Sequence, residues 1–289
     1  MERGTFRPTV VSWDDILDDP VHPGVDPAFY NQFILAEGDS WFTLAGIPTS
    51  NLLWSMRFHK RTMIVNCGRP GDTIKCMSDI ENNRNFRQAL MDKDIKWDLV
   101  LMSGGGNDLI DQAKDVIKNK NERGVERPQN IADYCDQQAL DNLISRIQDG
   151  YKRIFAFKAS QRDAQAQEKP VVLHTYDYAT PRNAPARFFT VPVLGPWLFK
   201  AMRAADVHKD DRNALTDYLI DHLAQGLLAL ADQSKKIHVV DTRGLLIRAS
   251  QDADGEDGDW INEIHPDHDG YSKIAKQIDI TTSELLNTP

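Results

Sequence analysis

Apolar residues occur in this chain in five short and nearly continuous runs, and a small or polar residue follows each run. The runs are rich in β-branched side chains. This pattern is typical of strands that are covered on both faces, as in a parallel sheet. We therefore predict five strands, at residues 33–37, 62–66, 98–102, 171–175 and 237–241.

Between these runs, apolar residues recur every three or four positions, which indicates amphipathic helices. The clearest stripe lies within residues 134–157. Similar stripes predict further helices at residues 52–59, 73–91, 211–234 and 270–286. Strands that alternate with helices favour right-handed crossovers, so we predict an α/β fold with a doubly wound sheet.

Two segments do not fit this alternation. Residues 1–30 are rich in proline and aspartate, and we expect an N-terminal extension that wraps the surface. Residues 31–289 have the size of one large domain. Within it, about residues 178–210 form an insert in which four prolines interrupt apolar and aromatic residues. The insert is either an added core layer or a lid over the strand ends, where open α/β sheets bind ligands.

Charge and composition argue against several classes of protein. The net charge of −9 disfavours nucleic acid or an anionic membrane as the partner. No apolar stretch is long enough to span a membrane, and the polar start is unlike an export signal, so we expect a cytoplasmic protein. Cys67, Cys76 and Cys135 form neither an even disulfide framework nor a zinc-binding spacing, and we expect reduced thiols.

An acidic loop at residues 252–263 is similar to a calcium-binding loop in the spacing of its carboxylates. Its sixth and eighth places hold Asp257 and Asp259, where such a loop needs glycine and an apolar residue. We therefore expect a solvated loop and no metal site.

Four polar blocks follow predicted strands in chain order. They are Gly-Asp-Ser-Trp at 38–41, Asn-Cys-Gly-Arg-Pro-Gly-Asp-Thr at 66–73, Ser-Gly-Gly-Gly-Asn-Asp at 103–108, and Asn-Glu-Ile-His-Pro at 262–266. Ser40 stands at the end of a buried strand, on a rigid support. A serine hydroxyl becomes a nucleophile only with a base and with donors for a developing oxyanion. We expect the base and the donors in the other three blocks.

Together these blocks resemble the SGNH (GDSL-type) hydrolases, over about residues 33–110 and 237–280. The resemblance implies that Ser40 is the nucleophile and His265 the base. It implies an oxyanion hole formed by the backbone N–H groups of Ser40 and Gly71 and the side-chain amide of Asn107. It also implies a flavodoxin-like three-layer α/β/α architecture with a central five-stranded parallel sheet, and an esterase that needs no cofactor.

The residue types suit these roles. Glycine at position 71 lets a backbone N–H approach a substrate oxygen without a Cβ in the way. Asn107 offers a neutral donor that does not compete for the proton. Two other interpretations are weaker: residues 71–73 could only be a turn before a helix, and residues 104–108 could bind a phosphate, although no nucleotide-binding pattern follows.

The sequence departs from the resemblance at one position. Most family members have an aspartate three residues before the histidine, and this chain has Asn262. An amide oxygen can accept the histidine Nδ1–H but stabilises the imidazolium less than a carboxylate does. We predict a Ser–His dyad assisted by Asn262, and the alternatives for the orienting group are a backbone carbonyl, Asp259, Glu263, Asp267 and Asp269.

The remaining histidines and aromatic residues give secondary candidates. His268 is the second candidate for the base, and His174 ends the fourth predicted strand, where it could face the pocket. Aromatic residues beside the nucleophile and in the insert could bind a small-molecule or lipid-like ester, namely Trp41, Phe188, Phe189 and Trp197. Alternatives on the same site are a thioesterase, a carbohydrate O-acetylesterase, or a non-catalytic ligand-binding relative, which Asn262 favours. The sequence does not indicate an oligomeric state.

Overall fold

The central element is a parallel sheet of six strands, as the computed structural model of residues 4–18, 27–43, 50–188 and 191–287 shows. The strand order is β1-β3-β2-β4-β5-β8, and every neighbouring pair is parallel. The bounds are β1 Thr9–Ser12, β2 Gln32–Gly38, β3 Thr62–Asn66, β4 Leu99–Ser103, β5 Val171–His174 and β8 Ile237–Val240. All five predicted strands are present.

The sixth strand, β1, lies in the segment that we expected to wrap the surface. It pairs with β3 at the edge of the sheet, and each of its residues is only partly buried. By contrast, every residue of β4 is buried, because helices cover both faces of the sheet centre. An edge strand of four residues in a region rich in proline and aspartate lacks the apolar run that marks the central strands.

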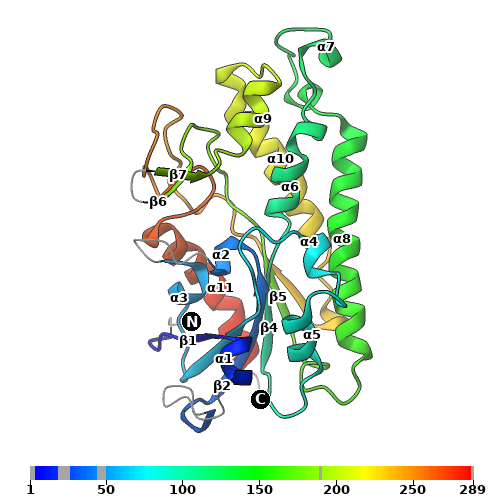
Figure 1. Ribbon diagram of the computed structural model, residues 1–289, viewed down its shortest axis with the longest axis vertical. Coiled ribbons are helices and arrows are strands. Elements are labelled where there is room, and N and C mark those ends of the chain that lie inside the picture. The colour runs from blue at the N-terminus through cyan, green and yellow to red at the C-terminus, as the bar shows by residue number, and fades with distance from the viewer. Residues whose placement is uncertain (1–3, 19–26, 44–49, 189–190, 288–289) are drawn as a thin grey trace.

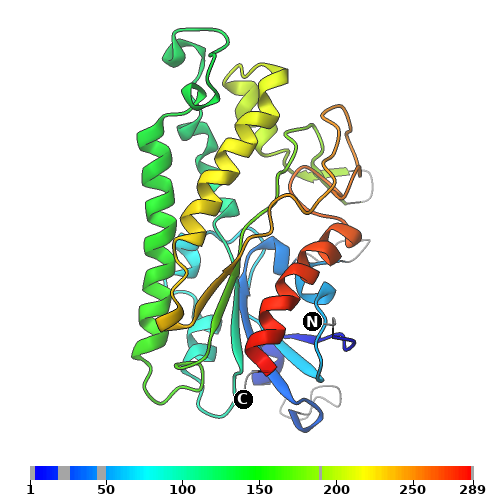
Figure 2. The same cartoon turned by 180° about the vertical axis from the view of Figure 1, so that it is seen from behind.

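Helices form the two outer layers (Figures 1 and 2). One face carries α4 (Ile74–Met77), α5 (Arg84–Met91), α6 (Gly106–Val116), α8 (Gln137–Ser160) and α10 (Arg212–Leu228). The opposite face carries α2 (Ser40–Thr43), α3 (Leu52–Ser55) and α11 (His268–Asn287). The fold is therefore the expected three-layer α/β/α sandwich. The short α1 (Trp13–Asp18) follows β1, and α7 (Lys120–Arg123) lies at the far end of the molecule from the sheet.

The predicted helices differ from the observed ones mainly at their ends. The stretch 73–91 splits into α4 and α5, since Ser78 ends the first and residues 79–83 form a polar turn. α8 begins after Asp136, whose side chain accepts the N–H of Ala139 at 2.9 Å. α10 ends at Leu228, and a 3₁₀ turn at Gln233–Lys235 follows it. Other 3₁₀ turns lie at Pro27–Phe29, Ile131–Tyr134 and Lys209–Asp211.

The insert forms two antiparallel strands, β6 (Ala186–Phe188) and β7 (Val191–Leu194), and the helix α9 (Leu198–Ala204). It stands beyond the carboxyl ends of the sheet strands (Figure 1). Leu198 and Met202 of α9 are buried, and α9 contacts α6. α9 therefore packs in the core, and its Leu198 also lines the cavity beside Ser40, so this part of the insert shares features of both alternatives.

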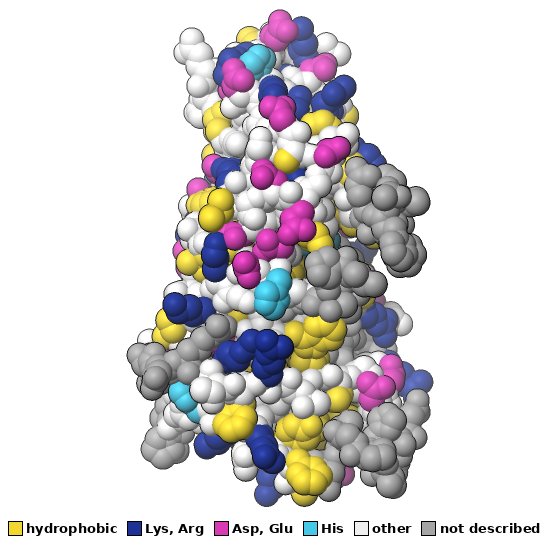
Figure 3. Space-filling view, turned by 90° about the vertical axis from the view of Figure 1, so that its left-hand side faces the viewer, with side chains coloured by type: hydrophobic (Ala, Val, Ile, Leu, Met, Phe, Trp, Pro, Cys, Tyr) yellow, Lys and Arg dark blue, Asp and Glu magenta, His cyan; other side chains and the backbone are white. Residues whose placement is uncertain are grey.

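The surface and the cysteines add little that points to a macromolecular partner. Figure 3 shows a face on which acidic side chains gather near the middle and basic ones lie below them, so this face has no continuous basic surface. Within the described residues, no helix is long and apolar enough to cross a membrane, and no group of three or more metal-ligating side chains occurs. All three cysteines are free.

Candidate active site

Ser40 lies where β2 ends and α2 begins, at the carboxyl edge of the sheet. The carboxylate of Asp39 fixes this turn by accepting the N–H of Trp41 (3.0 Å) and the hydroxyls of Ser103 (3.2 Å) and Tyr176 (2.5 Å). Burial raises the pKa of Asp39 to about 6. Asp39 therefore joins the ends of β2 and β4 to the residues after β5. These hydrogen bonds fix the backbone turn that carries Ser40.

His265 approaches Ser40 from the other end of the chain. Its Nε2 lies 2.8 Å from the Oγ of Ser40, and the two residues are 5% and 8% exposed. His265 belongs to the segment 257–267, here called the histidine loop, which lies between β8 and α11. Backbone hydrogen bonds within this loop fix its path, from the N–H of Ile261 to the carbonyl of His265 (3.0 Å) and from the N–H of Asp267 to that of Asp259 (2.9 Å).

Asn262 holds the ring of His265. Its Oδ1 lies 3.0 Å from Nδ1 of His265 and also accepts the backbone N–H of Ile264 (3.1 Å) and of His265 (3.0 Å). The two backbone donors require an oxygen at this position, so the amide cannot turn its NH₂ group toward the ring. Nδ1 must then carry the proton, which leaves Nε2 as a free base facing the hydroxyl of Ser40.

The alternative orienting groups are engaged elsewhere. Asp259 accepts the N–H of Ile247 at 2.5 Å and forms an ion pair with Lys273, and Asp267 accepts the N–H of Gly270 at 2.7 Å. Asp269 is exposed. Among the described residues no carboxylate forms a hydrogen bond or ion pair with the ring, and burial lowers the pKa of His265 to about 4. The ring is therefore neutral at pH 7, as a general base must be.

The predicted oxyanion donors lie at the start of α2 (Ser40), in the loop after β3 (Gly71) and in the first turn of α6 (Asn107). Asn107 is the second residue of α6, and its Nδ2 donates to the carbonyl of Asp72 at 2.9 Å, next to Gly71. Gly71 has φ +83°, a conformation that disfavours other residues, and a Cβ there would meet no heavy atom within 4 Å. Asn107 and Ser40 line the same cavity. The amide of Asn107 thus joins the Gly71 loop to the edge of the sheet at which Ser40 lies.

A model of the GDSL-like lipase/acylhydrolase family matches residues 38–273, a stretch that includes Ser40, Asn107 and His265. The chain belongs to this family. A lipase, Lip_vut3, from a goat rumen metagenome is similar in structure, with a TM-score of 0.56 at 14% identity over 88% of this chain and 98% of that one. An extracellular lipase from Streptomyces rimosus has a TM-score of 0.51 at 12% identity, over 87% and 99% of the two chains. These likenesses show the fold, and no curated protein sequence matches the chain.

In this GDSL-like chain the other two candidate histidines make their hydrogen bonds to groups other than the hydroxyl of Ser40. His268 is exposed, and its Nδ1 is 3.3 Å from the hydroxyl of Ser50. His174 is buried with its Nδ1 2.7 Å from the carbonyl of Thr175, and its ring stacks on that of Trp41. Burial lowers the pKa of His174 to about 4, so it is a neutral packing residue.

The four aromatic candidates for substrate binding have different positions. Trp41 is 4% exposed, and its indole N–H donates to the carbonyl of Ile264 at 3.2 Å, so it supports the histidine loop. Trp197 is half-buried with its ring edge-on to His265, 5.6 Å between centroids. Phe188 lies in β6, where only the backbone is described, and Phe189 lies outside the described residues.

Arg182 is a site residue that the sequence did not reveal. Its side chain is fully buried at the start of the insert, and in the part of the chain that the structure describes its acceptors are backbone carbonyls of residues 253–262. These acceptors are the carbonyls of Ala253 (3.2 Å), Gly255, Trp260 (3.3 Å) and Asn262 (2.9 Å). A single arginine between prolines carries no recognisable pattern, so only the structure could identify it.

Glu263 makes the reciprocal connection. Its buried carboxylate accepts the backbone N–H of Trp197 and of Phe199 (2.6 Å) in the insert, and its own N–H donates to Ala184 (2.9 Å). Burial raises the pKa of Glu263 to about 8. Hydrogen bonds in both directions therefore join the insert to the histidine loop. They also fix the position of Trp197, whose ring lies against that of His265.

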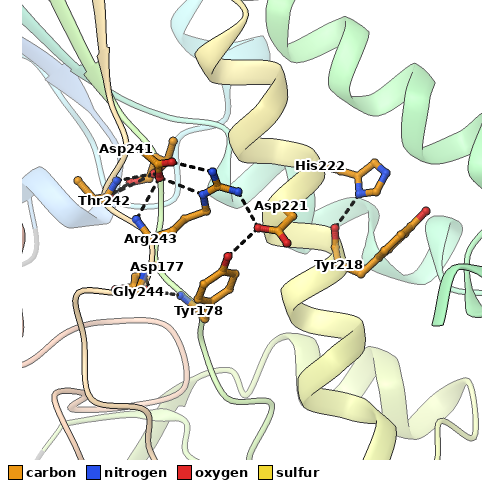
Figure 4. A network of polar contacts seen from close by, with 10 residues as sticks. Asp177, Tyr178, Tyr218, Asp221, His222, Asp241, Thr242, Arg243 and Gly244 are labelled. Carbon is orange, nitrogen blue, oxygen red and sulfur yellow. Dashed lines mark hydrogen bonds and ion pairs between the residues drawn. The ribbon is translucent and has the colours of Figure 1, made fainter.

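A further network joins the loops after β5 and β8 to α10 (Figure 4). The carboxylate of Asp177 accepts the N–H groups of Gly244, Leu245 and Leu246 at 2.7–2.8 Å. Nearby, Asp221 of α10 accepts from the hydroxyl of Tyr178 (2.7 Å) and from Arg243 (2.6 Å). This network supports the start of the long segment that carries the histidine loop.

Proposed function

We propose that this protein is a serine esterase that hydrolyses carboxylic esters through Ser40 and His265. The observation that carries the proposal is the chain of contacts from Asn262 Oδ1 to His265 Nδ1 and from His265 Nε2 to Ser40 Oγ, at 3.0 Å and 2.8 Å. A serine, a neutral imidazole and an oriented acceptor in this order are what nucleophilic acyl transfer needs.

The reaction follows from the geometry. Ser40 Oγ attacks the ester carbonyl carbon while His265 Nε2 takes the hydroxyl proton. The resulting oxyanion receives hydrogen bonds from the N–H groups of Ser40 and Gly71 and from the amide of Asn107. His265 then gives its proton to the departing alcohol. A water molecule then gives a proton to His265 Nε2 as its oxygen attacks the acyl carbon. The bond between that carbon and Ser40 Oγ breaks, His265 returns the proton to Ser40, and the acid leaves.

Asn262 is compatible with this mechanism, although its uncharged side chain is also the feature that favours a non-catalytic relative. An asparagine in this place fails when it stabilises the wrong tautomer of the histidine. Here the N–H groups of Ile264 and His265 fix the amide oxygen toward Nδ1, so the ring keeps the reactive tautomer. We infer a working base whose imidazolium receives less stabilisation than a carboxylate would provide.

The proposal is tested by ester hydrolysis with matched histidine variants. His265→Ala should lower kcat for p-nitrophenyl acetate by roughly 10³-fold or more, because the serine loses its base. His268→Ala is the control, since that ring lies on the surface near Ser50, and it should retain full activity. Equal losses in the two variants would refute the assignment of the base.

A further inference from the structure

A groove of about 480 Å³ lies at the opposite end of the sheet from Ser40. Val171 and Ile237, the first residues of β5 and β8, line it together with the last turns of α8 and the residues that follow α10. Figure 2 shows the ends of these two helices beside the start of β8. The volume suits a small ligand. The residues that we assign to ester hydrolysis are not among the described residues that line this groove.

The groove combines apolar and charged side chains. Its apolar part includes Phe155, which is half-buried, and Val171, Leu230 and Ile237, which are buried. Its polar part consists of four lysines, two carboxylates and two uncharged residues, namely Lys152, Lys158, Lys235, Lys236, Glu168, Asp232, Gln167 and Ser234. Lysines thus outnumber acids here, in a chain whose net charge is −9.

Two of the four lysines are paired with acids. Lys235 Nζ lies 2.9 Å from the carboxylate of Asp232. Lys152 Nζ lies 3.4 Å from that of Asp149, and both of these side chains are exposed. These two lysines therefore leave no excess charge in the groove.

Lys158 and Lys236 form no ion pair in the part of the chain that the structure describes. Lys158 is 6% exposed, and its Nζ donates to the backbone carbonyl of Gln167 at 2.7 Å. The Nζ of Lys236 donates to the carbonyl of the next residue, Glu168, at 3.0 Å. The two ammonium groups therefore converge on neighbouring carbonyls. Each ammonium has three N–H donors, and its carbonyl takes one of them.

The charges at this place do not balance. Burial lowers the pKa of Lys158 to about 8, and the charge of Lys236 acts in the same direction, while the exposed carboxylate of Glu168 opposes both. Two ammonium groups and one carboxylate leave a single excess positive charge. A monoanion between the two lysines would neutralise this charge and accept N–H groups that the two carbonyls do not use.

Lys236 also has an unusual backbone. Its φ of 56° and ψ of 39° lie in the left-handed region, where a Cβ is unfavourable and glycine is the usual residue. The carboxyl end of α8 favours a cation such as Lys158, but it gives no reason for a lysine in this left-handed turn. Residues in such conformations cluster at functional sites. A role for the Lys236 side chain in the groove accounts for its presence.

We propose that the groove is a binding site for an organic carboxylate with an apolar body, such as the anion of a medium-chain fatty acid. The carboxylate lies between the ammonium groups of Lys158 and Lys236, and the apolar chain lies along Phe155, Val171 and Ile237. The single excess charge selects a monoanion over a phosphate dianion. The site is separate from Ser40 and does not depend on the proposed esterase activity.

The test is isothermal titration calorimetry with octanoate, acetate and 1-octanol, each below its solubility limit and in a buffer without carboxylate or phosphate. Octanoate should bind with one-to-one stoichiometry. Acetate has the charge without the apolar chain, and 1-octanol has the chain without the charge. Each should therefore bind about tenfold more weakly than octanoate, or less tightly still.

Lys236→Gly separates the role of the side chain from that of the fold. It should weaken octanoate binding about tenfold or more, because one charge-assisted hydrogen bond is lost. Its melting temperature should be equal to that of the wild type or higher, because glycine adopts the left-handed conformation without strain. Lys236→Arg keeps the charge and should keep most of the affinity.

Asp206→Gly is the matched control. Asp206 is also a non-glycine residue with a left-handed backbone, at φ 52°, and it is not among the described residues that line the groove. Its replacement should change the melting temperature in the same direction as Lys236→Gly and leave octanoate binding unchanged. Ser40→Ala should likewise bind octanoate as the wild type does.

Four outcomes would overturn the proposal. The first is the absence of octanoate binding, and the second is binding that is undiminished in Lys236→Gly. The third is acetate or 1-octanol binding as tightly as octanoate. The fourth is a loss of binding in Ser40→Ala, which would place the ligand in the active site. Because none of these measurements uses ester hydrolysis, each leaves the test of the proposed function separate.

Discussion

Asn262→Asp should make the protein a faster esterase above neutral pH. The substitution exchanges a neutral acceptor, 3.0 Å from Nδ1 of His265, for a carboxylate of the same shape. The N–H groups of Ile264 and His265 that now bind the amide oxygen can bind the carboxylate equally well. The variant therefore keeps the geometry and changes the charge.

The size of the effect follows from that charge. Two unit charges about 4 Å apart interact by about 4 kcal/mol at an effective dielectric constant of 20, when Nδ1–H belongs to an imidazolium. Burying a new carboxylate in this site offsets a large part of that gain. We expect about 1.4 kcal/mol of net stabilisation in the transition state, which corresponds to a tenfold rise in kcat/KM at pH 8.

The pH dependence should change as well. The pKa of His265 is lowered to about 4 by burial, and a carboxylate beside it raises that pKa. Since the base acts only in its neutral form, activity is lost as the pH falls through this pKa. The acidic limb of the kcat/KM profile should therefore move to higher pH in the variant, and the variant should lose its advantage near pH 5.

The assay is the hydrolysis of p-nitrophenyl acetate between pH 4 and pH 8.5, with Asn262→Ala as the control that removes the acceptor. Asn262→Ala should be the slowest of the three proteins. A fully folded Asn262→Asp variant that is no faster than wild type at pH 8, with an unmoved acidic limb, would refute the orienting role of Asn262.

Three further predictions address other residues. Asn107→Ala should lower kcat about 10²-fold with little change in KM, since it removes an oxyanion donor; Asn107→Asp should not restore the rate. Arg182→Met should lower the free energy of unfolding in urea by about 3 kcal/mol, because four carbonyls of the loop at 253–262 lose their donor; an unchanged midpoint would contradict this. Burial raises the pKa of Glu37 from 4.5 to about 8. Between these pH values the folded protein keeps the carboxyl proton of Glu37 while the unfolded chain loses it, so the free energy of unfolding falls as the pH rises from about 4.5 to 8. Glu37→Gln should therefore stabilise the protein at pH 9 and have little effect at pH 4, as chemical unfolding at the two pH values would show.

The central fold could be predicted from the sequence because strands that are buried on both faces need apolar residues at successive positions. β2 and β4 are buried along almost their whole length, and each contains an uninterrupted apolar run, at residues 33–36 and 99–102. β1 is covered less, so its four residues Thr9–Ser12 give only a weak signal. Helix ends depend on single hydrogen bonds, such as the one that the N–H of Ala139 donates to the carboxylate of Asp136. Periodicity does not show such ends, and it predicted one helix over 73–91, where α4 ends before Ser78 and α5 begins after Asn83.

The site was predictable as far as it depends on residues at strand ends. Ser40 and Asn107 stand in short polar blocks directly after apolar runs, and His265 stands in a polar block between the last strand and the last helix, which suggested that the three share one edge of the sheet. Arg182 and Glu263 act on backbone groups of segments distant in sequence, and such contacts follow no pattern of residue types. The choice of Asn262 over four nearby carboxylates likewise depends on three hydrogen bonds that only the folded loop defines.

The role of Ser40 as the nucleophile can be measured most directly by reaction with a fluorophosphonate, followed by intact mass and peptide mapping. We predict one phosphonyl adduct per chain, located on Ser40 and absent from Ser40→Ala. An adduct on another residue, or undiminished labelling of Ser40→Ala, would contradict the mechanism.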